Sequence, residues 1–252
     1  FRPVTVVAPE GCILNTTFPH PVQARAKTTN NINQVLFGAV WPVLGEHAQA
    51  GAGSIWPLSV HGDTEDHGRF SVHILPHGGR GAMRDMDGLV PIAFPHNSSV
   101  TPIEIFETQS PVRIQRKAFR PDSAGPGRSR GGVGQTMIFE NAGSTTFHAR
   151  VRPDKITCAP PGIDGGRNGR TGEVWFNGER LDAFPILDFA PGDRIELRMP
   201  GGAGFGRPEE RDPAKVLHDV VMGIVTPEGA VRDYGLDPSE VAASTAPVGR
   251  DG

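Results

Sequence analysis

Glycine is unusually dense between Gly78 and Gly134, and this density constrains the fold more than any other feature of the sequence. The block contains GGRGAMRDMDG at 78–88, the acidic segment PIEIFE at 102–107 and RPDSAGPGRSRGGVG at 120–134, which alone holds five glycines and three arginines. Glycine suits backbone that takes a positive φ or approaches another group closely, and arginine forks onto carboxylates and phosphates. The block is either a tightly built structural corner or the lining of an anion-binding or catalytic site.

The composition indicates a loop-rich globular protein. Its 252 residues include 33 glycines and 24 prolines, about twice the usual share of the two, without a collagen-like period. A formal net charge of −3 gives no electrostatic argument for a nucleic-acid partner or an anionic membrane. Cys12 and Cys158 are far apart and form no C-x-x-C motif, which favours reduced thiols and a cytoplasmic location.

Helix is predicted in only two regions. After Thr28 and Thr29, which we expect to cap the first helix, apolar residues recur three or four apart up to Leu44. In the C-terminal region, Asp212 and Pro213 begin an apolar stripe, and a short helix runs from Thr226-Pro227 to Tyr234-Gly235. Residues 237–252 are predicted to form a flexible tail.

Short β-type runs separated by turns fill residues 59–207. The predicted strands are FSVHIL (70–75), TPIEIFE (101–107), VRIQRKAF (112–119), TMIFEN (136–141), TTFHARV (145–151), GEVWFNG (172–178) and DRIELRMP (193–200). The Asn-Gly pair in FNGER (176–180) predicts a hairpin. The predicted fold is therefore mostly β (α+β): an antiparallel β-sandwich or barrel-like body, one helix near the N-terminus and two short C-terminal helices. Its predicted parts are 1–58 (an extended strand plus an amphipathic helix), 59–207, 208–236 and the tail.

A cluster of histidines suggests a metal site but does not match one. Such ligands suit Zn, Mn or Fe, yet residues four apart on a strand lie roughly 13 Å apart, too far for one ion. We therefore favour a polar, solvent-exposed loop for the cluster, which comprises His61, His67, His73 and His77 with Asp63, Glu65 and Asp66.

Five polar residues of the 78–134 block are candidates to line a site or to hold its turns: Asp87, Asn97, Glu107, Asp122 and Arg130. Carboxylates can act as general acids or bases, and an amide can orient a substrate carbonyl. Structural alternatives are that Asp87-Gly88 is a turn and that Glu107 pairs with Arg113 or Arg116. Another is that Arg130 and Asp122 form a structural ion pair.

Neither glycine-rich motif matches a nucleotide-binding pattern. RSRGGVG (128–134) lacks the P-loop consensus and a following long helix, and PGGAGFG (200–206) lacks a βαβ setting. An ATP site inside this chain is therefore not expected.

The order of the motifs resembles the B subunit of the hydantoinase/5-oxoprolinase family, which is related to subunits of acetone and acetophenone carboxylases. The stretches that carry the resemblance are RPVTVVAPEGCILN (2–15), GGRGAMRDMDG (78–88), TPIEIFE (101–107), RPDSAGPGRSRGGVG (120–134), PPGIDGGRNG (160–169) and PGGAGFGRPEERDPAKVLHDVVMGIVTPEGAVRDYG (200–235). Ala124 and Ala118 depart from the family pattern, which often has glycine and tyrosine there.

The resemblance implies how the activity is shared among polypeptides. RP-x-x-x-x-APEG falls in the middle of such subunits, so the chain is expected to be the C-terminal half of a B subunit whose N-terminal half is missing. A divalent metal is also implied, with His and Asp ligands expected in that missing half, and ATP is expected to bind an actin-like, hydantoinase A-type partner subunit. The implied reaction is ATP-dependent hydrolysis of a cyclic amide such as a hydantoin or 5-oxoproline. The alternatives are a ketone carboxylase subunit and a non-catalytic assembly segment.

Overall fold

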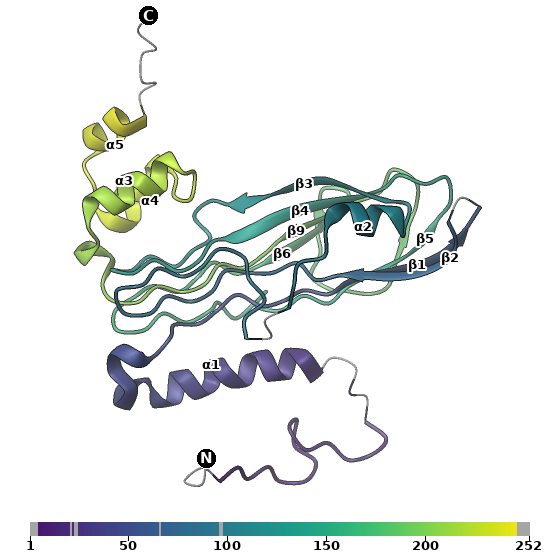
Figure 1. Cartoon of the computed structure of the whole chain (residues 1–252), viewed down its shortest axis with the longest axis horizontal. Coiled ribbons are helices and arrows are strands. Elements are labelled where there is room, and N and C mark those ends of the chain that lie inside the picture. The colour runs from purple at the N-terminus through teal and green to yellow at the C-terminus, as the bar shows by residue number, and fades with distance from the viewer. Residues whose placement is uncertain (1–4, 21, 23–24, 66, 96–97, 246–252) are drawn as a thin grey trace, which may run out of the picture.

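The structure is a computed structural model that describes residues 5–20, 22, 25–65, 67–95 and 98–245. Two antiparallel sheets form one end of an elongated body, and glycine-rich extended segments continue from them to the other end (Figure 1). The C-terminal helices lie beside that second end, and a long helix lies along one side. The predicted mostly-β class with few helices is confirmed. Within the described ranges, no helix is both long and apolar enough to cross a bilayer.

The first sheet has four strands in the order β2 (Gly68–Ile74), β1 (Leu58–Thr64), β5 (Phe147–Val151) and β8 (Leu187–Phe189), all antiparallel to their neighbours. The strands predicted at 70–75 and 145–151 are β2 and β5. Strand β1 was not predicted because its sequence LSVHGDT contains glycine and aspartate, which are uncommon in strands.

The second sheet has five strands in the order β3 (Val112–Arg120), β4 (Gly134–Asn141), β9 (Arg194–Arg198), β6 (Glu173–Phe176) and β7 (Glu179–Arg180). All four neighbouring pairs are antiparallel. The predicted Asn-Gly hairpin joins β6 to β7, with φ of 50° at Asn177 and 85° at Gly178. Positive φ at both turn residues is what a two-residue hairpin with native twist requires.

The main hydrophobic core lies between the two sheets, so the body is a sandwich. Alternate residues of both sheets point inward, and Phe147 packs edge-on against Phe70 and Phe189 with ring centroids 5.4 Å apart in each pair. Burying each such side chain contributes about 1.5–3 kcal/mol. The largest fully buried core residues are Trp56, Phe106, Phe139, Phe189, Leu58, Met137, Ile195, Leu197 and Met199.

The segment predicted as an acidic strand at 101–107 is instead a helix, α2 (Ile103–Thr108). Phe106 is its buried residue and packs edge-on against Phe139 at 6.3 Å. The strand prediction was wrong because so short a run fits both the two-residue period of a strand and the 3.6-residue period of a helix. Apolar and polar residues alternate in it, but Ile103 and Phe106 are also three residues apart, on one helical face.

Extended glycine-rich segments form a second packed region, which we call the glycine bundle: residues 48–54, 76–93, 121–133, 160–172 and 199–206. Three consecutive residues of the last segment donate backbone hydrogen bonds to three different segments: Gly202 to Gly132, Ala203 to Gly51 and Gly204 to Arg167. Bonds that radiate in this way are typical of polyproline II-type chains, which have three residues per turn and no internal hydrogen bonds.

Glycine is required in this bundle because the backbones touch. A Cβ added to Gly132 would lie 1.8 Å from the Leu89 carbonyl oxygen, and one added to Gly79 would lie 1.9 Å from that of Gly132. Only glycine permits such approaches. These contacts favour the structural interpretation of the block.

The predicted N-terminal helix is α1 (Arg25–Leu44), followed by the short 3₁₀ turn η1 (Gly45–His47). Thr28 and Thr29 lie inside its first turns, so the predicted threonine cap was wrong. Asn31 Nδ2 donates to Asp154 Oδ2 at 3.0 Å, which ties the helix to the body. Much of its apolar stripe is uncovered, with Val35 69% and Val43 89% exposed. The chain was predicted to begin with an extended strand, but described residues 5–9 show no regular strand, and a turn follows at Glu10-Gly11.

The C-terminal region contains η2 (Pro208–Glu210), α3 (Pro213–Val221), α4 (Pro227–Tyr234) and α5 (Pro238–Thr245). The predicted helix starts at Asp212 and Thr226 and the predicted end at Gly235 are confirmed: Asp212 accepts a hydrogen bond from Ala214 N, Thr226 accepts one from Gly229 N, and Gly235 is left-handed. Helix α5 occupies residues 238–245 of the predicted tail, 237–252, and residues 246–252 lie outside the described ranges. Val241, 2% exposed, packs in the apolar cluster of these helices, which orders residues 238–245.

Candidate functional site

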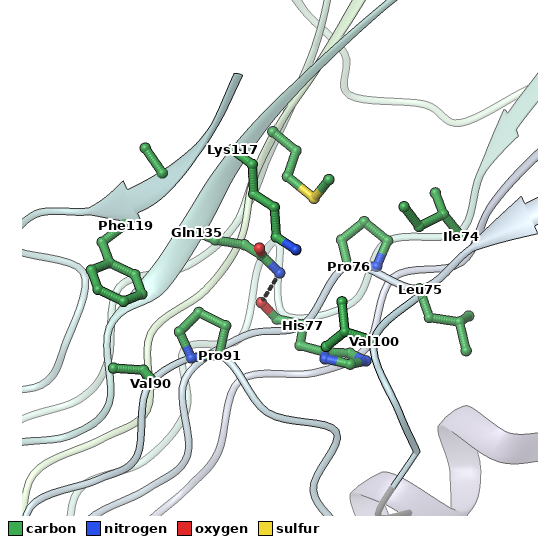
Figure 2. Close-up of a pocket in the computed structure, with 12 residues that line it drawn as sticks. Ile74, Leu75, Pro76, His77, Val90, Pro91, Val100, Lys117, Phe119 and Gln135 are labelled. Carbon is green, nitrogen blue, oxygen red and sulfur yellow. Dashed lines mark hydrogen bonds between the residues drawn. The ribbon is translucent and has the colours of Figure 1, made fainter. Parts of the chain in front are cut away.

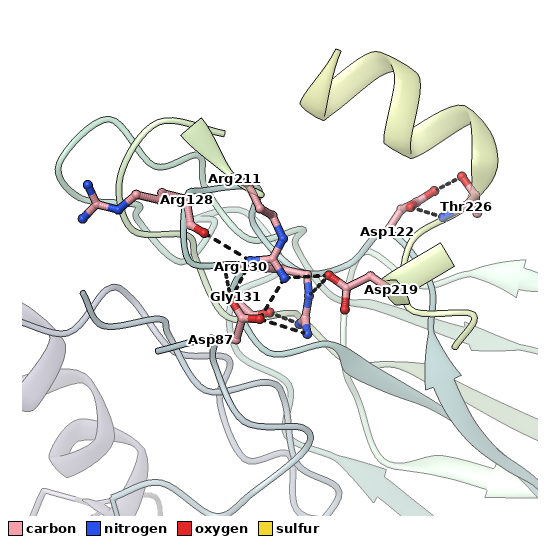
Figure 3. A network of polar contacts seen from close by, with 8 residues as sticks. All are labelled: Asp87, Asp122, Arg128, Arg130, Gly131, Arg211, Asp219 and Thr226. Atoms are coloured by element: carbon pink, nitrogen blue, oxygen red, sulfur yellow. Dashed lines mark hydrogen bonds and ion pairs between the residues drawn. The ribbon is translucent and has the colours of Figure 1, made fainter. Parts of the chain in front are cut away.

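Two of the predicted site residues belong to one buried ionic network, which we call the clamp: Asp87, Arg130, Arg211 and Asp219 (Figure 3). Arg211 reaches both oxygens of Asp87, at 2.7 and 2.8 Å, and Asp219 Oδ2 at 2.8 Å. Arg130 donates its Nε to Asp219 Oδ2 at 2.9 Å and its backbone N–H to Asp87 Oδ1 at 2.7 Å. Two arginines and two aspartates balance in charge.

Electrostatics favour the charged forms of Asp87 and Arg211. Burial by itself would raise the pKa of Asp87, but the hydrogen bonds and charges of Arg211, with help from Arg130, hold it below its usual value. Burial by itself would lower the pKa of Arg211, but Asp87 and then Asp219 raise it. The side chains of Arg211 and Asp219 are only 1% and 5% exposed, so neither is presented to a substrate in this structure.

The clamp joins the glycine bundle to the C-terminal helices, because Asp87 and Arg130 belong to the bundle and Asp219 to α3. The predicted pairing of Arg130 with Asp122 was wrong. Asp122 instead fastens the start of α4: its oxygens accept from Thr226 N at 2.8 Å and from Thr226 Oγ1 at 2.7 Å. Both residues therefore make structural contacts, Asp122 at a helix start and Arg130 within the four-charge clamp.

The other predicted residues lie elsewhere. Glu107, on α2, accepts a hydrogen bond from Ile114 N at 2.7 Å, at the start of a bulge in β3. Its carboxylate therefore holds a strand backbone, and the expected ion pair with Arg113 or Arg116 was wrong. Asn97 lies outside the described residues.

A cavity of about 450 Å³ opens beside the second sheet, near the glycine bundle (Figure 2). Most of its wall is apolar, and three polar side chains reach it: His77, Lys117 and Gln135. Gln135 Nε2 donates to the His77 carbonyl oxygen at 2.9 Å. The complete lining comprises Ile74, Leu75, Pro76, His77, Val90, Pro91, Val100, Lys117, Ala118, Phe119, Gln135 and Met137.

His77 is the least expected member of this cavity. It is 1% exposed, whereas the sequence pattern placed it in a solvent-exposed polar cluster. Burial, and secondarily the positive charge of Lys117, lowers the pKa of His77 to about 4, so its imidazole is neutral near pH 7. Its position between Pro76 and Gly78-Gly79 was a signal available in the sequence, because a histidine flanked by bundle glycines is held against packed backbone.

The remaining histidines of the cluster are exposed, as predicted, but only His67 lies in a turn, because His61 belongs to β1 and His73 to β2; Asp66 lies outside the described residues. His61 stacks on His148 with ring centroids 5.3 Å apart. Among the residues that the structure describes, no three His, Cys, Asp or Glu side chains gather to hold a metal ion. Cys12 and Cys158 are both free thiols.

Comparisons with known proteins match this arrangement to one family. The Hydantoinase B/oxoprolinase family model matches residues 1–208. The putative D-/L-hydantoinase B subunit from Pseudomonas sp. (strain NS671) is 30% identical over 93% of the chain and 40% of its own length. The beta subunit of caprolactamase from Pseudomonas jessenii is 28% identical over 94% of the chain and 44% of its own length. The chain thus spans less than half the length of these relatives.

Solved structures share the fold. The crystal structure of ATP-dependent caprolactamase from Pseudomonas jessenii matches with a TM-score of 0.74 at 24% identity, over 95% of this chain and 45% of that one. The nucleotide-free structure of acetone carboxylase matches with a TM-score of 0.67 at 20% identity, over 81% of this chain and 34% of that one. Because the family model covers most of the chain, the protein belongs to the Hydantoinase B/oxoprolinase family.

Proposed function

We propose that the chain is the C-terminal part of the B subunit of an ATP-dependent enzyme that hydrolyses a cyclic amide, a lactam or a hydantoin. The supporting observation is the likeness to hydantoinase and caprolactamase subunits along more than nine-tenths of the chain. In this proposal ATP is bound and cleaved by a hydantoinase A-type partner, and the N-terminal half of the same polypeptide carries the ligands of a divalent metal.

The glycine bundle supports placing ATP on the partner. A phosphate loop needs free backbone N–H groups that point at the anion. In the 128–134 motif, Gly131 N donates to Gly125 O and Gly132 N to Arg80 O, while Arg130 N is bound to Asp87. These donors are therefore used within the fold.

The exposed face of α1 supports an N-terminal half that packs on this chain. Val35 and Leu36 are 69% and 54% exposed, and Ile13 and Leu14 beside them are 76% and 52% exposed. They line an apolar hollow of about 470 Å³ together with Ile32. Contiguous apolar surface of this kind marks an interface. We assign it to the rest of the subunit, because the relatives have more than half their length outside the matched part.

The test is ATP consumption by the complete B subunit assembled with its A-type partner. ADP release should require a lactam or hydantoin and should accompany ring opening in a fixed ratio. ATP consumption only with a ketone and bicarbonate would replace this proposal with a carboxylase.

One observation favours a second candidate, a non-catalytic assembly role for the 78–134 block. The polar groups of Asp87, Glu107 and Asp122 already bind partners within the fold. Replacing Glu107 with Gln, with folding monitored separately, separates the two: unchanged turnover favours assembly, and lost turnover in a folded subunit favours catalysis.

A further inference from the structure

The cavity beside β3 and β4 contains a polar atom that the described part of the fold leaves unused. Among its lining residues, His77 Nε2 is buried and lacks a hydrogen-bond partner. An unsatisfied buried polar atom costs free energy, so native structures keep few of them. Such an atom in the wall of a cavity is explained when a ligand supplies the missing partner.

The backbone around His77 is held rigidly. Gln135 Nε2 binds the His77 carbonyl oxygen, and the neighbouring residues bind the facing segment: Trp56 N donates to Pro76 O at 2.9 Å and Gly78 N to Ser54 O at 2.8 Å. The imidazole is therefore attached to a backbone segment anchored by hydrogen bonds, and it forms part of the cavity wall (Figure 2). A donor or acceptor fixed before binding loses little entropy when a ligand arrives.

The rest of the cavity wall is apolar and encloses a volume suited to a small molecule. Ile74, Val90, Val100, Phe119 and Met137 line a volume of about 450 Å³, within the roughly 300–1,000 Å³ of small-molecule sites. A neutral imidazole offers one donor and one acceptor nitrogen, depending on its tautomer. A ring amide carries both complementary groups, an N–H and a carbonyl. The Lys117 ammonium at this cavity disfavours cationic ligands.

We propose that this cavity binds the ring of the cyclic amide, with the apolar wall around its carbon atoms and His77 Nε2 hydrogen-bonded to its amide. The inference rests on the proposed function and deepens it, because it gives the chain a part of the substrate site. It assigns His77 to substrate binding and no bond-breaking step.

The experiment measures lactam binding to the complete B subunit with its A-type partner, without ATP, by isothermal titration calorimetry. The probe is a seven-membered lactam, and acetamide, which has the amide without the ring, is the control ligand. His77→Phe removes the polar atom while keeping the volume, and Val100→Trp fills the cavity. His73→Phe, the same exchange on the exposed face of β2, is the matched control.

We expect saturable lactam binding that weakens at least about tenfold in His77→Phe, the effect of one lost buried hydrogen bond. Val100→Trp should abolish binding, His73→Phe should leave it unchanged, and acetamide should bind far more weakly than the lactam. Lactam affinity unchanged in both cavity variants would overturn the inference, as would a complete assembly that binds no lactam because another part of it fills the cavity.

The steady-state kinetics separate the two proposals. If the assembled enzyme shows lactam-dependent ATP consumption but neither cavity variant changes KM, the inference is wrong and the proposed function stands. If His77→Phe raises KM while kcat is kept, the inference is supported. If lactam stimulates no ATP consumption at all, the proposed function fails, and calorimetry still reports whether the cavity binds the ring.

Discussion

The clamp and the His77 cavity differ in what surrounds their buried polar groups. In the clamp, Asp87 and Asp219 are matched by Arg130 and Arg211, and the network bridges the glycine bundle and α3. In the cavity, a neutral histidine keeps one nitrogen without a partner among the described residues. Arg211 Nε also lacks a hydrogen-bond partner, but it lies among the balanced charges of the clamp, whereas His77 Nε2 belongs to the wall of a cavity that a ligand can enter. The densest group of buried charges in this chain is therefore used within the fold, and the cavity is the part to test for ligand binding.

The glycine bundle supplies residues to both the clamp and the cavity wall. A substitution that disrupts its packing should therefore have the largest effect on stability. Gly132→Ala places a Cβ 1.8 Å from the Leu89 carbonyl oxygen, so one backbone must move. We expect a loss of more than about 4 kcal/mol, in the exceptional range for a point substitution, measured as soluble yield and by chemical denaturation.

The matched control for this substitution is Gly38→Ala in α1, where an added Cβ meets nothing within 4 Å. It should leave the protein folded and gain up to about 1 kcal/mol from helix propensity. Equal behaviour of the two alanine variants would show that the bundle tolerates rearrangement.

Local signals explain what the sequence predicted well. The Asn-Gly hairpin, the caps at Asp212 and Thr226 and most strands depend on residues a few positions apart. The contacts that shape the candidate site do not: Arg130 and Asp219 are 89 residues apart, and Gln135 and His77 are 58 apart. Nothing local distinguishes Asp219 from Asp122 as a partner for Arg130.

The arrangement of the glycine bundle could not be predicted, for a related reason. Its segments lack the alternation of strands, and the reason for each glycine lies on another segment, as Leu89 does for Gly132. The pattern revealed close approach but not the neighbour. Helix α5 was missed because its Ala/Ser-rich sequence shows little of the apolar face that Val241 provides.

The second largest effect should come from opening the clamp. Arg211→Met leaves Asp87 and Asp219 with Arg130 as their remaining cation, and removing one partner of a buried ion pair costs about 3–5 kcal/mol. The midpoint of urea denaturation measures the loss. Arg194→Met breaks an exposed pair with Glu140 and should cost less than about 1 kcal/mol. Similar losses for the two variants would mean that the clamp is no stronger than a surface pair.

His77 in the cavity should make the stability of the protein depend on pH between about 6.5 and 4. The unfolded chain protonates His77 near pH 6.5, whereas the folded chain does so only near a pKa of about 4. The His77 contribution to stability is therefore complete above pH 6.5 and is lost as pH falls toward 4. We expect a loss on the order of 2 kcal/mol after allowing for solvent at the open side of the cavity.

Denaturation midpoints of wild type and His77→Phe between pH 7 and pH 4 test this dependence. The difference between the two proteins should shift in favour of the phenylalanine variant as pH falls. A difference that stays constant over this range would show that the folded state protonates His77 as readily as the unfolded chain does.

The smallest effect should come from the helix start that Asp122 fastens, next to the clamp. Thr226→Ala removes the hydroxyl that accepts from Gly229 N and donates to Asp122 Oδ2, and losing a helix cap costs about 1 kcal/mol. Thr226→Ser keeps the hydroxyl and should restore most of that loss. Hydrogen exchange should then accelerate in α4 while the sandwich core stays protected, because the change is confined to one helix start. Accelerated exchange throughout the glycine bundle would instead mean that Asp122 and the clamp hold the C-terminal helices as one cooperative unit.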